Sequence, residues 1–487
     1  MRRQIGGISA FAAIPIARLV ANNPGERLPV LRLAVYWAVL VVIAGGSVLL
    51  VSRSRPLLAR RFAIGLSILV FGVTYLAVAL RNALGLSATL GIDGAIWLVF
   101  AISITGFLIS RWNWVQGFVP LLGAFLLLYP VVEIVASPPS RAVTFGSAQE
   151  PAVELERAPN VYWFVLDGYG RADVLGEFGD VRQDSFTREM EARGFMIDSR
   201  ASAAYPMSFL SIASTLSMEY VADANTDVSS EGPFYLVTQG ENVVVDSLRD
   251  RGYAYVLYPG APQWSGSQCR GVEDICLAEG GLDPADRALL EMTAAASILR
   301  SALQSTDSDR VNPIEVVERL EGHRPSNPFF LFAHVMSPHP PFLWSGPDCD
   351  LLERPIGSVF GDWGATSDYL NAIHCLNRQL ITTMDRIIDA DPEAVIIVQG
   401  DHGPDYGVEM LNVEHVWSPG DIRQRFGVLS AIRLPPTCDV PIGTSLVNTF
   451  RVVLSCLSGE RIPLLPPRAW SGSYGLSDLT EVDPPTR

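Results

Sequence analysis

The hydrophobic pattern divides the chain into a membrane-spanning part and a globular part. Four apolar stretches are each about as long as the roughly 20 residues that cross a bilayer core. They cover residues 31–52, 62–81, 91–109 and 116–136. A further span is expected over residues 6–22, although Pro15 and Arg18 interrupt its apolar run. The pattern therefore predicts an α-helical membrane bundle of about five spans over residues 1–136.

Beyond the spans, short apolar runs alternate with helical patterns. Five runs are typical of buried strands: Val161–Leu166, Tyr253–Tyr258, Phe329–Ala333, Ala394–Val398 and Val428–Ile432. The clearest helical pattern covers residues 366–388. This alternation predicts an α/β domain over residues 159–475, with a mostly parallel central sheet flanked by helices. Residues 137–158, rich in Pro, Ser and Glu, are expected to form a linker, and residues 476–487 a tail.

Charge is distributed as unevenly as hydropathy. Residues 1–136 contain 11 Arg and three acidic residues, whereas the remainder contains 25 basic and 48 acidic residues. An acidic domain argues against a nucleic-acid partner, because phosphate contacts need clustered cations. Arginines precede the first span and fill the loops after the second and fourth spans. The positive-inside rule then places the N-terminus in the cytoplasm, and five spans of a cell membrane deliver the acidic domain to the extracytoplasmic side.

All six cysteines lie in the acidic domain. An even number of cysteines in one exported domain is typical of disulfides. The candidate pairs are Cys269 with Cys276, Cys438 with Cys456, and by remainder Cys349 with Cys375. The sequence alone does not define this connectivity. A zinc site is the less favoured alternative, because no CxxC spacing occurs.

Three of the predicted strands are followed by residues that bind metals or anions. Asp167 follows the first strand, and Asp401 with His402 follows the fourth. His334 and His339 are expected in a proline-stiffened loop after the third strand. Ligands collect beyond the carboxyl ends of strands in α/β sheets, so we expect Asp167, Asp401 and His402 to bind a divalent metal. Taken alone, Asp167 would equally suit a helix cap.

A helix start supplies a candidate nucleophile. Pro206 stands where a helix should begin, and apolar residues at helical spacing follow it. Ser208 would then lie in the first turn, where free backbone N–H groups and the helix dipole favour an anion. A metal contact would lower the pKa of its hydroxyl. In the alternative interpretation Ser208 is an ordinary N-cap, and Ser202 or Ser211 is the nucleophile.

Together these motifs resemble the alkaline phosphatase/sulfatase superfamily. The motifs are DGYG at 167–170, YPMS at 205–208, HVMSPHPPF at 334–342 and GDHG at 400–403. The membrane-anchored branch that contains lipoteichoic acid synthases and phosphoethanolamine transferases is similar in layout, and the resemblance covers about residues 159–435 and the spans.

The resemblance implies one tightly held divalent metal, with ligands at the positions of Asp167, Ser208, Asp401 and His402. It also implies that His339, together with His334, contacts the transferred group or protonates the leaving oxygen. Mn²⁺ or Zn²⁺ suits this ligand set, and Mg²⁺ and Ca²⁺ are further candidates.

The sequence departs from the family pattern at the nucleophile. A Thr or a modified Cys usually occupies the position of Ser208. The signature of formylglycine sulfatases is absent there, and we interpret its match at residues 137–141, before the first catalytic strand, as chance. No second set of Asp and His ligands is evident, and His415 is expected on a surface loop.

These expectations describe a membrane-anchored, metal-dependent hydrolase or transferase that acts on phosphodiesters or sulfate esters through a covalent serine intermediate. Attachment to the membrane favours transfer of a lipid-derived phospho-head-group to a glycan or lipid acceptor in the cell envelope. One alternative is a hydrolase of sulfate or phosphate esters on surface glycans. The other is a non-catalytic membrane sensor or assembly protein, against which the complete ligand set argues.

Overall fold

The computed structural model divides the chain into two compact units. One unit comprises Met1–Ala142 with Gly280–Thr306, and the other comprises Val143–Glu279 with Asp307–Arg487. The structure describes residues 2–22, 28–72, 91–136, 158–179, 183–226, 228, 231–260, 269, 271–278, 286, 289, 311–326, 328–345, 349–357, 363–474 and 479–485.

The first unit is helical in its described residues. Its helices are α1 (Arg2–Asn22), α2 (Val30–Ser54), α3 (Pro56–Phe71), α5 (Gly91–Ile109) and α6 (Asn113–Ala136). Phe11, Ile64 and Val119 belong to one buried cluster, which joins α1, α3 and α6. Arg18 of α1 also lies 3.6 Å from Glu133 of α6, so the two charges compensate each other within the bundle.

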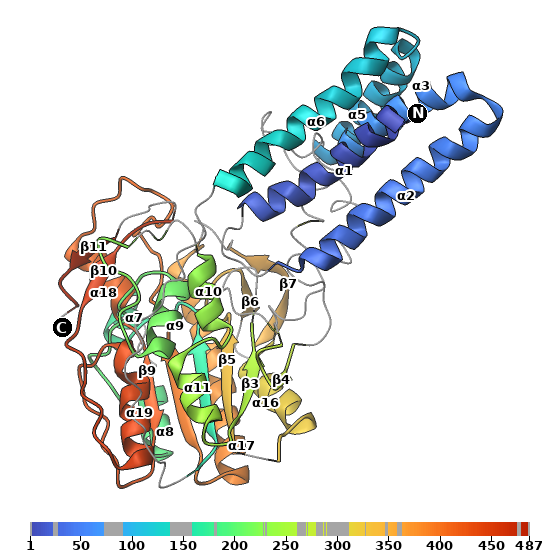
Figure 1. The fold of residues 1–487 in the computed structure, drawn as a ribbon. Helices are drawn as coiled ribbons and strands as arrows, with labels where there is room; N and C mark the ends of the chain where they lie inside the picture. Colours follow the sequence, from blue (N-terminus) through green and yellow to red (C-terminus); the bar gives the residue numbers. More distant parts are fainter. Residues whose placement is uncertain are drawn as a thin grey trace. The chain divides into compact units, whose positions relative to one another are not determined.

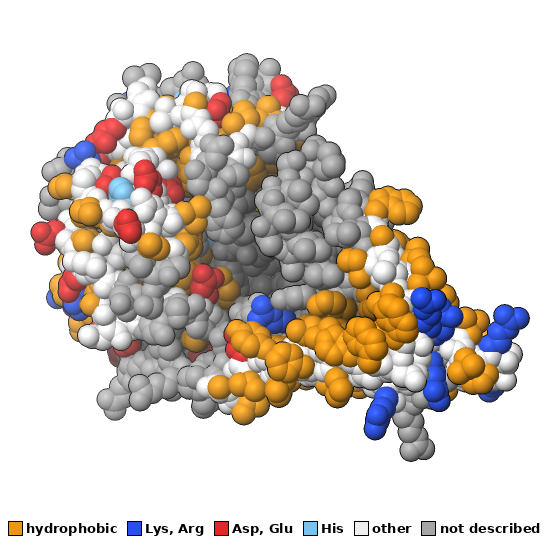
Figure 2. Space-filling view, turned by 90° about the horizontal axis from the view of Figure 1, so that it is seen from above, with side chains coloured by type: hydrophobic (Ala, Val, Ile, Leu, Met, Phe, Trp, Pro, Cys, Tyr) orange, Lys and Arg blue, Asp and Glu red, His pale blue; other side chains and the backbone are white. Residues whose placement is uncertain are grey.

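Three of these helices are long and apolar enough to cross a membrane. They are α1, α2 and α6, as judged over the described residues. Hydrophobic side chains such as Val42, Leu50 and Leu121 are exposed on α2 and α6, and side chains of this kind occupy much of the visible face of the bundle (Figure 2). The span predicted over residues 62–81 begins within α3, and its part from residue 73 lies outside the described residues. The number of spans therefore stays a prediction.

The second unit is an α/β domain built on a seven-stranded sheet with the order β2-β9-β8-β1-β5-β3-β4. Its strands are β1 (Val161–Leu166), β2 (Met196–Ile197), β3 (Ala254–Tyr258), β4 (Ile275–Cys276), β5 (Phe329–Val335), β8 (Val395–Gly400) and β9 (Ser430–Arg433). All five predicted strands are present. The sheet is mostly parallel, as predicted, and β9 is the strand that runs antiparallel to its neighbours β8 and β2.

Helices cover both faces of the sheet (Figure 1). Alternate side chains of β1 point to opposite faces, so Trp163 and Phe164 belong to different buried clusters. One cluster includes side chains of α9 (Ser208–Ser217), α10 (Gly232–Thr238), α11 (Val243–Arg249) and α19 (Thr449–Ser458). The other includes side chains of α7 (Ala172–Glu177), α8 (Gln183–Ala192), α16 (Pro313–Gly322) and α17 (Thr366–Ala390). The remaining elements among the described residues are α18 (Pro419–Phe426), the short helix η3 (Leu446–Asn448) and two hairpins. One hairpin pairs β6 (Phe342–Ser345) with β7 (Asp350–Ile356), and the other pairs β10 (Ala469–Ser471) with β11 (Thr480–Val482).

Two expectations about local structure are wrong. His334 lies inside β5 rather than in the following loop, because β5 stays paired with β1 through Val335. The predicted tail contains β11, which pairs with β10. Burial of Trp470 and Leu479 explains this hairpin, because both side chains join the main core.

Three disulfides link the six cysteines of the second unit. The pairs are Cys269–Cys276, Cys349–Cys375 and Cys438–Cys456. They are the candidate pairs of the sequence, so this prediction is confirmed. The zinc-site alternative is excluded for these cysteines, because none retains a free thiol.

Candidate active site

The two candidate aspartates follow adjacent strands at the same level of the sheet. Leu166, the last residue of β1, is paired with Gly400 of β8 on one side and with Val335 of β5 on the other. Asp167 and Asp401 are therefore the first residues beyond the paired ends of neighbouring parallel strands. Gly168 then turns the chain with a φ of +75°, and an added Cβ there would come within 2.8 Å of the Trp363 ring. The turn requires glycine for both reasons.

Asp167, Asp401 and His402 form a buried cluster of potential metal ligands. One ligand atom from each residue lies within 4.8 Å of the others. Nε2 of His402 is 3.5 Å from Oδ1 of Asp167 and 3.6 Å from Oδ2 of Asp401. Both of these carboxylate oxygens are buried and lack a hydrogen-bond partner among the described residues. Unpaired buried carboxylate oxygens are costly, so this donor set fits a divalent cation.

The hydrogen bonds of His402 prepare its ring for a metal. Nδ1 lies 3.0 Å from the carbonyl oxygen of Gly403, which can only accept, so Nδ1 carries the proton. The lone pair is therefore on Nε2, the atom that faces the two carboxylates. Metal-binding histidines commonly donate their second N–H to a carbonyl in this way, which fixes the ring orientation.

The electrostatics of the cluster also favour a cation. Burial and then the nearby Asp167 carboxylate raise the pKa of Asp401 from 3.8 to about 6. Burial opposes ionisation of Asp167 too, but the rings of His339, His334 and His402 outweigh it and hold the pKa of Asp167 below its ordinary value. Burial, followed by the positive charge of Arg425, keeps the pKa of His402 well below its ordinary value. A neutral imidazole between two crowded carboxylates is a suitable metal site.

Ser208 lies next to this cluster. Ser208 is the first residue of α9, and Met207 is the N-cap. The alternative in which Ser208 is an ordinary N-cap is therefore wrong. Its hydroxyl is 3.1 Å from Nε2 of His402. The hydroxyl of Ser211 instead donates to the backbone carbonyl of Asp401 at 2.6 Å. Ser202 is buried, and its backbone forms isolated β-bridges with Gly427 and Ser445. Of the three candidate serines, Ser208 is the one with its hydroxyl against the His402 ring.

The two candidate histidines have different environments. His334 is fully buried, and its Nε2 lies 3.4 Å from Oδ2 of Asp167. His339 is half-buried in the following loop, where its Nδ1 lies 2.7 Å from the carbonyl oxygen of Pro340. Its ring centroid is 4.8 Å from that of Trp363 and 6.3 Å from that of His402. The structure thus places both histidines around the cluster. His415, by contrast, lies 3.1 Å from Asp421 through its Nε2.

Arg425 is a site residue that the sequence did not reveal. Its side chain is buried and donates to backbone carbonyls of Pro206 and Gly403, which flank Ser208 and His402. An arginine in the last turn of a polar helix ordinarily suggests a solvated residue near the negative helix end. No local sequence signal distinguishes Arg425 from such a residue.

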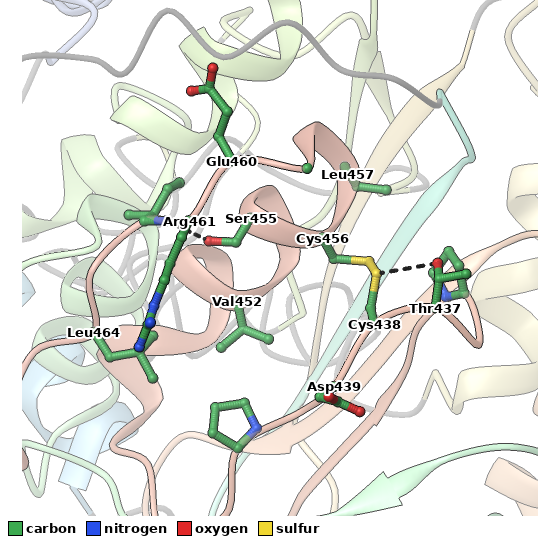
Figure 3. Close-up of a pocket in the computed structure, with 14 residues that line it drawn as sticks. Thr437, Cys438, Asp439, Val452, Ser455, Cys456, Leu457, Glu460, Arg461 and Leu464 are labelled. Carbon is green, nitrogen blue, oxygen red and sulfur yellow. Dashed lines mark hydrogen bonds between the residues drawn. A yellow bond between two sulfur atoms is a disulfide. The ribbon is translucent and has the colours of Figure 1, made fainter.

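A separate hollow lies beside the disulfide Cys438–Cys456 (Figure 3). Its volume is about 650 Å³, and its wall includes Asp439, Glu460 and Arg461. The residues that line it come after Arg433, the last residue of β9, in the chain. Arg433 pairs with Ile396 near the start of β8, whereas Asp401 follows the other end of β8. None of the predicted site residues lines this hollow.

Comparison with known proteins assigns the chain to a family. The sulfatase family model matches residues 159–427, which is more than half of the chain. The chain therefore belongs to the sulfatase family, and the superfamily resemblance of its motifs is confirmed. The comparison with curated proteins found no match.

Several solved structures are similar to the chain. The C-terminal periplasmic domain of EptC from Escherichia coli has 12% sequence identity and a TM-score of 0.42, covering 67% of this chain and 94% of that chain. A phosphonate monoester hydrolase of Agrobacterium radiobacter has 14% identity and a TM-score of 0.39, with coverages of 64% and 79%. A protein in the alkaline phosphatase superfamily from Vibrio parahaemolyticus has 14% identity and a TM-score of 0.38, with coverages of 68% and 79%. Because each TM-score is below 0.5, the family assignment rests on the sequence match.

Proposed function

We propose that the protein is a membrane-anchored, metal-dependent hydrolase or transferase of phosphodiesters or sulfate esters that uses Ser208 as its nucleophile. The observation that carries the proposal is the buried convergence of Asp167, Asp401 and His402 beside the Ser208 hydroxyl. These four residues would hold the cation. When bound, a divalent cation would lower the pKa of the hydroxyl and offset negative charge on the ester.

The reaction then requires two displacements. In the first, Ser208 Oγ, having lost its proton to water, forms a bond to the phosphorus or sulfur atom, and the bond to the leaving oxygen breaks. We assign His339 as the group that gives this oxygen a proton, because its half-buried ring lies beside the cluster. His334 is fully buried against Asp167, so we assign it to positioning that carboxylate rather than to the substrate.

In the second displacement, an acceptor hydroxyl or water attacks the phosphorus or sulfur atom and gives its proton to His339, and the bond to Ser208 Oγ breaks. Water gives hydrolysis, and an alcohol gives group transfer. Attachment to a membrane supports a lipid donor, because a lipid head group is a substrate that a tethered domain meets at high local concentration. We therefore propose transfer of a lipid-derived phospho-head-group to a cell-envelope glycan or lipid.

The proposed location is a cell membrane with the α/β domain on the extracytoplasmic side. Three candidate membrane helices support the anchor. Three disulfides support an oxidising compartment, because the cytosol keeps thiols reduced.

Mass spectrometry of the Ser208 peptide tests the proposal. Full-length protein with Mn²⁺ or Zn²⁺ is incubated in micelles that contain phosphatidylethanolamine or phosphatidylglycerol, and then quenched with acid. We expect a phosphoethanolamine or glycerophosphate adduct on Ser208, and none on the Ser208→Ala protein. Parallel assays with p-nitrophenyl sulfate and bis(p-nitrophenyl) phosphate identify the ester class. An active protein whose adduct sits on another residue would contradict the role of Ser208.

A further inference from the structure

We propose that Arg425 is a positioning residue that holds the start of α9 and the metal-ligand loop at a fixed separation. This inference rests on the function proposed above. Arg425 belongs to the last turn of α18, and its side chain is 2% exposed. In the described part of the chain, its side-chain hydrogen bonds all go to backbone carbonyls. A buried guanidinium that binds two separate loops is well suited to set the distance between them.

One side of the guanidinium binds the segment that carries the nucleophile. Nε and Nη2 donate to the carbonyl oxygen of Pro206 at 3.0 and 2.7 Å. Pro206 stands two residues before Ser208 and immediately before the N-cap of α9. The two bonds to one oxygen therefore fix the turn from which Ser208 enters the site.

The other side binds the segment that carries the metal ligands. Nη1 donates to the carbonyl oxygen of Gly403 at 2.8 Å, and that same oxygen accepts the Nδ1 proton of His402. The amide of Gly403 in turn donates to the backbone carbonyl of Arg425 at 2.7 Å. An added Cβ at Gly403 would come within 2.0 Å of the Gln424 carbonyl oxygen. Arg425 thus clamps Gly403 from both ends of its backbone.

Together, the two sides position the proposed nucleophile and a proposed metal ligand. The contact between Ser208 Oγ and His402 Nε2 spans segments that Arg425 joins through Pro206 and Gly403. The guanidinium is planar and carries its N–H donors at fixed, separated positions, so it binds both carbonyls and also sets the distance between them. A lysine would keep the charge, but its single nitrogen on a flexible stem cannot reproduce the three hydrogen bonds in this geometry. Loss of an outer partner of a metal ligand typically weakens metal binding or activity about 10- to 100-fold.

The test compares full-length Arg425→Met and Arg425→Lys with the wild type in detergent. Mn²⁺ and Zn²⁺ affinities are measured by titration calorimetry, folding by circular dichroism, and kcat and KM with bis(p-nitrophenyl) phosphate. We expect both variants to bind these ions about 10- to 100-fold more weakly, with a loss in kcat and little change in KM.

Arg433→Met is the matched control. Arg433 also makes three hydrogen bonds to backbone carbonyls, those of Arg193, Ala394 and Pro392, at the opposite end of β8 from Asp401. We expect its metal affinity to stay within about twofold of the wild type, well below the loss typical of an outer metal partner. If loss of an arginine acted only through the stability of the fold, Arg433→Met would weaken metal binding as the Arg425 variants do.

Two outcomes would overturn the inference. In one, both Arg425 variants fold and bind metal as the wild type does. In the other, both fail to fold where Arg433→Met folds, which would make the guanidinium a purely structural element. A wild-type protein that binds neither ion would contradict the proposed function, and the role of Arg425 would fall with it.

Discussion

The hydroxyl of Ser208 and Nε2 of His402 lie 3.1 Å apart, although 194 residues separate them along the chain. The contact joins the first residue of α9 to the segment that follows β8. Asp167 and Asp401 place their unpaired oxygens around the same point. Variants of the individual residues should therefore have separable effects on metal binding, nucleophilic attack and proton donation.

Ser208→Ala is expected to lower kcat by on the order of 10³-fold or more, because it removes the attacking oxygen. Mn²⁺ binding should survive, since Asp167, Asp401 and His402 remain. Steady-state kinetics and calorimetry on the same preparation check both parts. Ser214→Ala is the control, because Ser214 lies in the same helix and its hydroxyl bonds the Glu219 carbonyl. If the Ser208→Ala protein kept most of the activity, Ser208 would be excluded as the nucleophile.

His339→Asn should affect substrates according to their leaving groups. An alkoxide needs a proton as it departs, so activity on alkyl phosphodiesters should fall about 10²- to 10⁴-fold. A nitrophenolate leaves without a proton, so activity on nitrophenyl esters should fall less than about tenfold. His415→Asn, whose parent side chain is bonded to Asp421, should leave both rates near the wild-type level. Equal losses on both substrates would assign His339 to binding instead of proton donation.

Asp401→Asn is expected to stabilise the metal-free protein at neutral pH. In the metal-free fold, burial and Asp167 raise the pKa of Asp401 to about 6. A raised pKa favours the folded state while the group is protonated, so this contribution is present below about pH 4 and is lost as pH rises through 6. The free energy of unfolding of the variant should thus exceed that of the wild type by on the order of 3 kcal/mol at pH 7.5 and match it near pH 4.

Thermal unfolding in the presence of a chelator measures this difference. The lowered pKa of Asp167 has the opposite effect on stability. The ionised Asp167 stabilises the folded protein above its ordinary pKa of 3.8, and this stabilisation is lost at still lower pH. Added Mn²⁺ should reverse the order at pH 7.5, because only the wild type keeps both carboxylates. A metal-free variant that is less stable than the wild type at pH 7.5 would show that the two carboxylates do not repel each other.

Membrane topology can be checked with a reporter that fluoresces only when it folds in the cytoplasm. Fused after Arg55, in the arginine-rich loop behind α2, it should fluoresce. Fused after Arg487, it should stay dark, because an odd number of spans would place the α/β domain outside. A bright fusion at Arg487 would mean an even number of spans and a cytoplasmic domain.

The convergence of the candidate ligands Asp167, Asp401 and His402 could be predicted from the sequence because their positions depend on local patterns. Apolar runs identify the buried strands. Asp167 is the first polar residue after β1, and Asp401 comes directly after the last residue of β8. Parallel pairing in a common register then brings them together. The fold class followed from the same alternation of strands and helices.

Features that depend on long-range packing were not predictable. His334 is part of β5 because β1 pairs with it residue for residue, and no local signal extends a strand through a histidine. Arg425 acquires its partners only when the turns at Pro206 and Gly403 meet beneath α18. The hairpin of β10 and β11 similarly depends on the core position of Trp470.

The central place of β1 has a consequence for the order of events in biosynthesis. Its two sheet neighbours, β5 and β8, are both made long after it, and Asp401 follows the later of them. The nascent chain therefore cannot complete the proposed cation site until Asp401 and His402 have emerged. With the topology proposed above, the ion would be acquired outside the cytoplasm, and its identity would reflect the metals available in that compartment.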